Sequence, residues 1–105
     1  MVTITFDLDY EKMKQDGITE DDMLHPMREH AKKYGIEEIS NGVFTMDGKD
    51  ALTSIMIYVT KKTDEDHDYI KYLKTWILER DFHVEDCKIE TIKIYREEGI
   101  PFNND

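Results

Sequence analysis

The sequence predicts an α+β domain in which four antiparallel strands and two helices follow one another in the order β-α-β-β-α-β, with both helices on one face of the sheet. Three observations support this prediction. Residues 2–8 alternate apolar and polar side chains, residues 19–34 have helical spacing, and residues 51–60 contain no charge in a chain that is 36% charged. The 105 residues suit a single domain, which we expect to span 1–100, with a flexible tail at 101–105.

The first strand and the first helix have the clearest signals. The period of two in residues 2–8 is typical of a strand with one buried face. Thr19, followed by three acidic residues, predicts a helix start, because its hydroxyl can cap free amides and carboxylates favour the positive end of the helix dipole. Gly35 is the expected stop of this helix. Pro26 lies inside it and predicts a kink or a restart, since proline lacks the amide hydrogen.

The middle of the chain predicts further strands. Residues 36–40 and 43–46 are strand-like, and a turn or bulge is expected between them at 41–42. The Asp-Gly pair at 47–48 accepts positive φ angles and predicts a tight hairpin into 51–60. We therefore expect 51–60 to be a central strand around which the core forms.

The last third of the chain predicts a helix and a final strand. An acidic start at 63–66 precedes apolar residues at helical spacing, namely Tyr69, Ile70, Leu73, Trp76 and Ile77. Residues 84–98 are ambiguous, because β-branched residues favour a strand while acidic residues at their start and a glycine after them are helix signals. We favour a strand, which completes the succession found in ferredoxin-like domains; the alternative order is β-α-β-β-α-α.

The charge of the chain argues against one class of function. There are 24 acidic and 14 basic residues, a formal net charge of −10. Phosphate backbones are repelled by such a surface. The adjacent basic pairs, Lys32-Lys33 and Lys61-Lys62, are too short to form a convincing nucleic-acid footprint. We therefore expect no direct binding of nucleic acid.

Cysteine content and the first residues indicate the compartment. Cys87 is the one cysteine, so no intrachain disulfide can form, and we expect a buried thiol rather than a nucleophile. Zinc-binding spacing, a phosphate-binding glycine loop and an export signal are not recognisable, and no apolar run reaches the roughly 20 residues of a membrane helix. We expect a cytoplasmic protein without a cofactor, a bound metal or a membrane partner.

The predicted central strand has an unusually apolar outer side. Alternate residues of this segment point away from the helices, and that face is open in a sheet of this kind. We predict a partner or dimer surface there, formed by Leu52, Met56, Tyr58, Asp7, Asp9, Asp64 and Asp66. An apolar strip rimmed by carboxylates suits a partner whose own binding site is basic, as in nucleic-acid-binding proteins.

The sequence therefore predicts a non-enzymatic acidic binding protein, and the specific hypothesis is an inhibitor that covers a basic nucleic-acid-binding site. In size and charge alone the chain is similar to anti-CRISPR and other anti-defence proteins. One alternative is a small Mg²⁺-dependent hydrolase or nuclease that uses Asp7 and Asp9, which in fold outline is similar to the metal-dependent nucleases of CRISPR adaptation. The other alternative is a housekeeping homodimer module whose apolar strip is the subunit contact.

Overall fold

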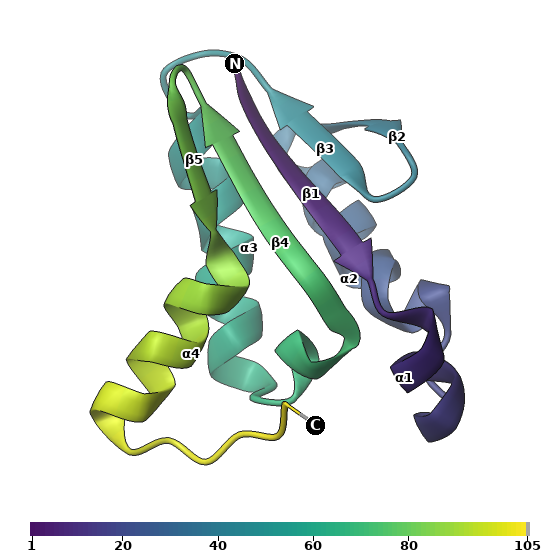
Figure 1. Cartoon of the computed structure of the whole chain (residues 1–105). Coiled ribbons are helices and arrows are strands. Elements are labelled where there is room, and N and C mark those ends of the chain that lie inside the picture. Colours follow the sequence, from purple (N-terminus) through teal and green to yellow (C-terminus); the bar gives the residue numbers. More distant parts are fainter. Residues whose placement is uncertain (105) are drawn as a thin grey trace.

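A five-stranded antiparallel sheet forms the framework of the computed structural model, which describes residues 1–104 (Figure 1). In spatial order its strands are β2 (Glu37–Ser40), β3 (Val43–Met46), β1 (Val2–Leu8), β4 (Leu73–Arg80) and β5 (His83–Asp86). The helices are α1 (Tyr10–Asp16), α2 (Glu20–Tyr34), α3 (Ala51–Glu65), α4 (Cys87–Glu98) and the 3₁₀ turn η1 (Tyr69–Tyr72). The α+β class and the antiparallel sheet are confirmed. The four-stranded ferredoxin-like arrangement is not confirmed, because the described sheet has a fifth strand.

The helices of the described chain are of ordinary length for a globular domain. The longest, α2 and α3, have 15 residues each. None of the helices within residues 1–104 has the length and apolar character needed to cross a membrane.

β1 lies at the centre of the sheet and has one buried face, as its alternating pattern predicts. Ile4 and Phe6 face the helices and are 0% and 4% exposed, whereas Asp7 is exposed on the opposite face. The strand pairs with β3 on one side and with β4 on the other. In Figure 1, α2 and α3 lie behind this sheet and cover the face that carries the apolar side chains.

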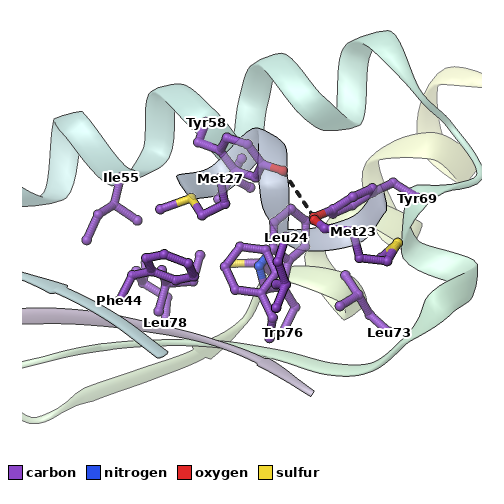
Figure 2. Close-up of a cluster of buried hydrophobic side chains, with 14 of the residues drawn as sticks. Met23, Leu24, Met27, Phe44, Ile55, Tyr58, Tyr69, Leu73, Trp76 and Leu78 are labelled. Atoms are coloured by element: carbon purple, nitrogen blue, oxygen red, sulfur yellow. Dashed lines mark hydrogen bonds between the residues drawn. The ribbon is translucent and has the colours of Figure 1, made fainter. Parts of the chain in front are cut away.

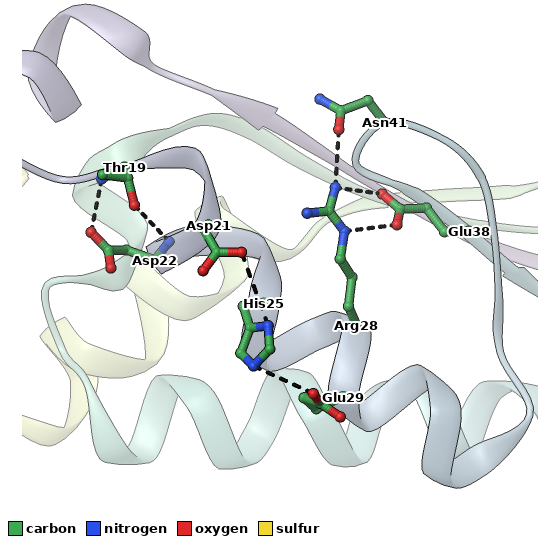
Figure 3. A network of polar contacts seen from close by, with 8 residues as sticks. All are labelled: Thr19, Asp21, Asp22, His25, Arg28, Glu29, Glu38 and Asn41. Carbon is green, nitrogen blue, oxygen red and sulfur yellow. Dashed lines mark hydrogen bonds and ion pairs between the residues drawn. The ribbon is translucent and has the colours of Figure 1, made fainter.

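α2 begins and ends where the sequence predicts. The Asp22 amide donates to Thr19 Oγ1 at 3.0 Å, and the Thr19 amide donates to Asp22 Oδ2 at 2.8 Å (Figure 3). These hydrogen bonds lower the pKa of the Asp22 carboxyl. Gly35 closes the helix with a φ of +74°, which glycine adopts without strain. The helix continues through Pro26, so the predicted restart is wrong.

A polar network ties α2 to the hairpin of β2 and β3 (Figure 3). Arg28 donates from Nε to Glu38 Oε1 at 2.8 Å and from Nη2 to Glu38 Oε2 at 3.0 Å. The same arginine donates to Asn41 Oδ1, and the Gly42 amide donates to Glu38. The hydrogen bond from Arg28 is the main cause that lowers the pKa of the Glu38 carboxyl. The strands and turn predicted between residues 36 and 46 are confirmed and are held against the helix by this network.

Residues 51–60 belong to helix α3, so the predicted central strand is wrong. The buried face of this helix repeats every three or four positions and consists of Ala51, Ser54, Ile55, Tyr58 and Val59. Packing of that face against the sheet outweighs the strand preference of its β-branched residues. The Asp-Gly pair at 47–48 leads into the helix, so the predicted hairpin at this point is wrong as well.

The predicted second helix is also wrong, because its apolar stripe belongs to η1 and β4. The register shifts where Asp7 and Leu8 of β1 meet β4, and this irregularity places Leu73 and Trp76 on the same buried side. Two buried residues three positions apart are typical of a helix, so this part of the strand has the sequence pattern of a helix. Residues 84–98 are divided between the end of β5 and α4, so the strand prediction is wrong for most of this segment.

The core lies between the sheet, α2 and α3 (Figure 2). The fully buried Trp76 ring lies 5.4 Å from the ring of Phe6 and 5.6 Å from that of Tyr69, measured between centroids. The Tyr69 hydroxyl donates to the Met23 carbonyl of α2 at 2.7 Å. Since its single hydrogen is used there, the Tyr58 hydroxyl of α3, 3.1 Å away, must be the donor of the second bond. This chain of hydrogen bonds joins α3, η1 and α2.

Residues 101–104 follow α4 without regular structure and contact two helices. The Phe102 ring lies 5.4 Å from the Tyr95 ring of α4, and the Asn104 carbonyl accepts a hydrogen bond from Lys12 Nζ of α1 at 3.0 Å. Residue 105, the last of the predicted tail, lies outside the described residues. The division into a domain and a flexible tail stays a prediction.

Candidate partner-binding groove

A groove of about 420 Å³ runs between α3 and α4, and its floor is apolar. Met56 and Val59 come from α3, and Cys87 and Tyr95 come from α4. Three of these side chains belong to the buried core, so the floor is continuous with the interior of the protein. Ile94 lines the same groove but is 49% exposed. The groove therefore offers apolar contact area to a partner.

The rim of this groove is acidic. Its carboxylates come from three elements, with Asp64 on α3, Glu85 on β5, and Glu90 and Glu98 on α4. All four are exposed. The described residues that line the groove include no lysine or arginine. An occupant would meet an apolar floor between negative charges, which favours cationic groups at its edges.

The acidic and apolar stripe of α4 follows from the local structure of that helix. Asp86 caps the helix, and its Oδ1 accepts hydrogen bonds from the amides of residues 88 and 89 at 2.9 and 3.3 Å. Glu90, Ile94 and Glu98 are spaced by four residues, so they lie along one side of the helix. That side borders the groove.

Tyr95 fastens α4 to α3. Its hydroxyl donates to the Thr63 carbonyl near the end of α3. Its ring, 3% exposed, lies 5.1 Å from the ring of His67. Burial, followed by the charges of the nearby Asp66 and Asp64, raises the pKa of this tyrosine to about 12, so its hydroxyl stays protonated near neutral pH. The floor of the groove is therefore held in place before any partner arrives.

The thiol in the groove is not an activated nucleophile. Cys87 is 4% exposed. Burial, followed by the negative charges of Glu85 and Asp86, raises the pKa of this thiol to about 12. The thiolate is the reactive form of cysteine, so Cys87 is unreactive near neutral pH. The buried thiol expected from the sequence is thus present.

The apolar surface continues from the groove along the outer side of α3. Leu52 and Ile57 line a shallower recess of about 560 Å³ together with threonines of the same helix. Ile57 is 40% exposed. Met56 and Asp64 line both the groove and the recess. The two hollows therefore form one surface on α3.

The structure brings three of the predicted surface residues together. Leu52, Met56 and Asp64 lie along the outer side of α3, although on a helix rather than on a strand. Tyr58 is 5% exposed and points into the core, where it contacts Tyr69 (Figure 2). The predicted position of Leu52, Met56 and Tyr58 on an open sheet face is therefore wrong. Their use in binding a partner stays a prediction.

The other three predicted residues lie outside this surface. Asp7 is exposed on the open face of the sheet, with Thr75 Oγ1 3.4 Å from its Oδ2. Asp9 caps α1 and accepts a hydrogen bond from a first-turn amide at 3.2 Å. Asp66 follows α3 and accepts a hydrogen bond from the Asp68 amide at 3.0 Å. Asp9 and Asp66 thus have local structural roles.

The hydrolase alternative predicts a Mg²⁺ site at Asp7 and Asp9, near the end of β1. Within residues 1–104, no three His, Cys, Asp or Glu side chains are grouped so that they could hold a metal ion. The use of Asp7 and Asp9 in a hydrolase stays a prediction that rests on these two residues.

Sequence reasoning missed the α4 side of the groove. The favoured prediction for Glu90, Ile94 and Glu98 is a strand, which places them together on one face of a sheet rather than on a helix beside α3. The acidic residues before α4 and Gly99 after it are the signals that could have found this helix.

The geometry of the groove is the basis on which a function can be proposed. Comparisons of the chain with protein-family models, with curated proteins and with solved structures found no match.

Proposed function

We propose that this protein is a non-enzymatic binding protein whose groove between α3 and α4 receives a basic, amphipathic segment of another protein. The observation that supports this proposal best is the combination of an apolar floor with a rim whose charged side chains are all carboxylates. An amphipathic helix presents apolar residues along one side and cations at its margins. Such a segment matches the groove in both respects.

The charge of the whole chain favours the same class of partner. A formal net charge of −10 attracts basic surfaces from a distance and accelerates their association. The same charge repels the phosphate backbone of nucleic acids. The partner we propose is therefore a protein with a basic nucleic-acid-binding site, which the acidic protein would cover and inhibit. This finer proposal rests on charge.

A second copy of the chain is a less suitable occupant. The groove rim of one copy would meet the equally acidic surface of the other, and like charges across an interface oppose association. Sedimentation velocity at several concentrations distinguishes the two possibilities, because a homodimer module would dissociate on dilution.

The direct test uses two synthetic helical peptides of about 15 residues that have leucines at helical spacing. The first carries lysines at its margins, and the second carries glutamates at the same positions. Fluorescence anisotropy should show binding of the lysine peptide and none of the glutamate peptide. Raising the salt concentration from about 0.05 M to about 0.5 M should weaken the binding, because it screens the rim.

Matched variants on α4 locate the binding site. Ile94→Asp places a charge in the groove and should abolish binding of the lysine peptide. Ile89→Asp is the matched control and should leave binding unchanged, because Ile89 is on the same helix, is 63% exposed and does not line the groove. Glu90→Lys should weaken binding of the lysine peptide, and Glu97→Lys, outside the groove lining, should do so much less. The proposal would be contradicted if the two variants of a matched pair weakened peptide binding equally, or if binding did not depend on the salt concentration.

A further inference from the structure

The fold brings lysines from both adjacent basic pairs to one pocket between α2 and α3. This pocket has a volume of about 340 Å³ and lies on the side of α3 that faces α2 rather than α4. Lys33 of α2 and Lys61 and Lys62 of α3 line it. The two lysine pairs are far apart in the sequence, so their convergence on this pocket is a property of the fold.

The local charge of the pocket is opposite to that of the chain as a whole. Three lysines face two glutamates, Glu29 and Glu65, which leaves one excess positive charge in a chain of net charge −10. Lys61 Nζ and Glu65 Oε1 are 4.0 Å apart and both side chains are exposed, so this ion pair holds the lysine only weakly. Lys61 is therefore free to turn towards an anion.

Aromatic rings form one wall of the pocket. The rings of His30 and Tyr34 lie one turn apart on α2, with centroids 4.4 Å apart and an angle of 30° between their planes. The Tyr58 ring lies 5.5 Å from that of His30. His30 Nε2 is 2.7 Å from the Ser54 carbonyl, and because a carbonyl only accepts, Nε2 carries the hydrogen and donates it. This bond anchors the imidazole to α3.

One lysine ammonium group lies close to this aromatic wall, since Lys33 Nζ is 5.6 Å from the centre of the Tyr34 ring. Lys62 Nζ lies instead 5.1 Å from the centre of the Tyr69 ring, which is buried in the core and does not line the pocket. A ring that stacks on Tyr34 would therefore lie near an ammonium group that can bind a phosphate. Lysine and aromatic side chains together are the combination with which proteins hold nucleotides that lack a paired strand.

We propose that this pocket binds a small aromatic phosphate monoester, with its planar ring against the His30 and Tyr34 rings and its phosphate between Lys33 and Lys61. The site shares no lining residue with the groove between α3 and α4, although Ile57 and Lys61 also line the shallower recess, and it does not depend on the function proposed for that groove. The ligand is a small molecule, so the repulsion that the acidic surface exerts on a long nucleic acid acts on it far less.

The test is isothermal titration of the purified full chain with adenosine monophosphate, with adenosine alone and with inorganic phosphate alone. The monophosphate should bind more tightly than either part, because only it meets both the rings and the lysines. Lys33→Gln and Lys61→Gln should each weaken the binding by about tenfold. Lys32→Gln is the matched control, since Lys32 neighbours Lys33 on the same helix but does not line this pocket.

Three results would overturn the proposal. These are the absence of binding of adenosine monophosphate at millimolar concentration, an equal loss of affinity in Lys32→Gln and Lys33→Gln, and equal affinity for inorganic phosphate and the monophosphate. Tyr34→Leu provides a further arm, because it should abolish the preference for the monophosphate over inorganic phosphate. Circular dichroism confirms that each variant is folded.

Discussion

The hydrogen-bonded chain of Tyr58, Tyr69 and the Met23 carbonyl allows a sharp prediction about stability. Tyr69 is 2% exposed, and its hydroxyl both accepts a hydrogen bond from Tyr58 and donates one to Met23. Burial is the main cause that raises the pKa of Tyr69 well above its usual value and the pKa of Tyr58 to about 12, so both hydroxyls are neutral near pH 7. Replacing either tyrosine by phenylalanine removes hydrogen bonds but keeps the ring.

The two substitutions should differ in cost. Tyr69→Phe removes both bonds and leaves the buried Tyr58 hydroxyl without its partner, which should lower the free energy of unfolding by about 2–4 kcal/mol. Tyr58→Phe removes one bond and leaves Tyr69 bonded to Met23, which should cost about 1 kcal/mol. The double variant should be no less stable than Tyr69→Phe alone, because it no longer contains an orphaned hydroxyl.

Guanidinium denaturation followed by tryptophan fluorescence measures these values. Trp76 is the one tryptophan of the chain, is fully buried and lies next to Tyr69, so its emission reports unfolding of this part of the core. Each kcal/mol should also lower the melting temperature by about 4–8 °C. Equal costs for the two single variants, or a double variant whose cost equals their sum, would refute the proposed direction of the hydrogen bonds.

Three further predictions follow from the network, the turn and the thiol. The Arg28 hydrogen bond lowers the pKa of the Glu38 carboxyl below 4.5. The ionised carboxylate therefore stabilises the folded protein above that pH, and this stabilisation is lost as the pH falls through the lowered pKa. In thermal melts below about pH 4.5, Glu38→Gln should lose less stability than the parent protein, because it has no carboxylate to protonate. In urea titrations, Gly42→Ala should lower the free energy of unfolding more than Gly35→Ala does. Both glycines have positive φ angles, but only at Gly42 would the added Cβ meet a backbone oxygen of β1, at 3.0 Å. Equal losses of stability in the two variants would contradict this reason. Cys87 should react with a thiol reagent at pH 8 only at the rate of unfolding, and fast labelling of the folded protein would show that the thiol is accessible.

Local capping chemistry predicted the parts of the fold that depend on neighbouring residues. Thr19 and Gly35 mark both ends of α2, and Gly99 marks the end of α4, because caps are decided by a few adjacent side chains. The segment 51–60 could not be assigned in this way. Its β-branched residues favour a strand, and the helical repeat of its buried positions becomes decisive only when the sheet is there to cover them.

The irregularity opposite β4 explains the second large error. Leu73 and Trp76 lie three apart and point to the same side only because the register shifts at Asp7 and Leu8 of a strand far away in the sequence. No local pattern contains that information.

Part of the candidate surface was predictable because its residues have a spacing that suits both a helix and a strand. Leu52, Met56 and Asp64 are spaced by multiples of four, so they share one side of a helix. In a strand, Leu52 and Met56 would share a face as well. The prediction that these residues lie together therefore does not depend on the type of element. Tyr58 differs, because in the helix it turns into the core.

The central position of β1 has a consequence for how the chain folds during synthesis. Val2 pairs with Arg80, and Leu8 pairs with Leu73, so β1 has to wait for β4, which is made about 65 residues later, before their ladder can form. Before β4 leaves the ribosome, β1 can pair only with β3, so the other edge of the central strand stays unpaired and the core lacks the side chains of β4. The nascent chain therefore carries an open strand edge until residue 80 emerges, and the sheet is completed in a late step.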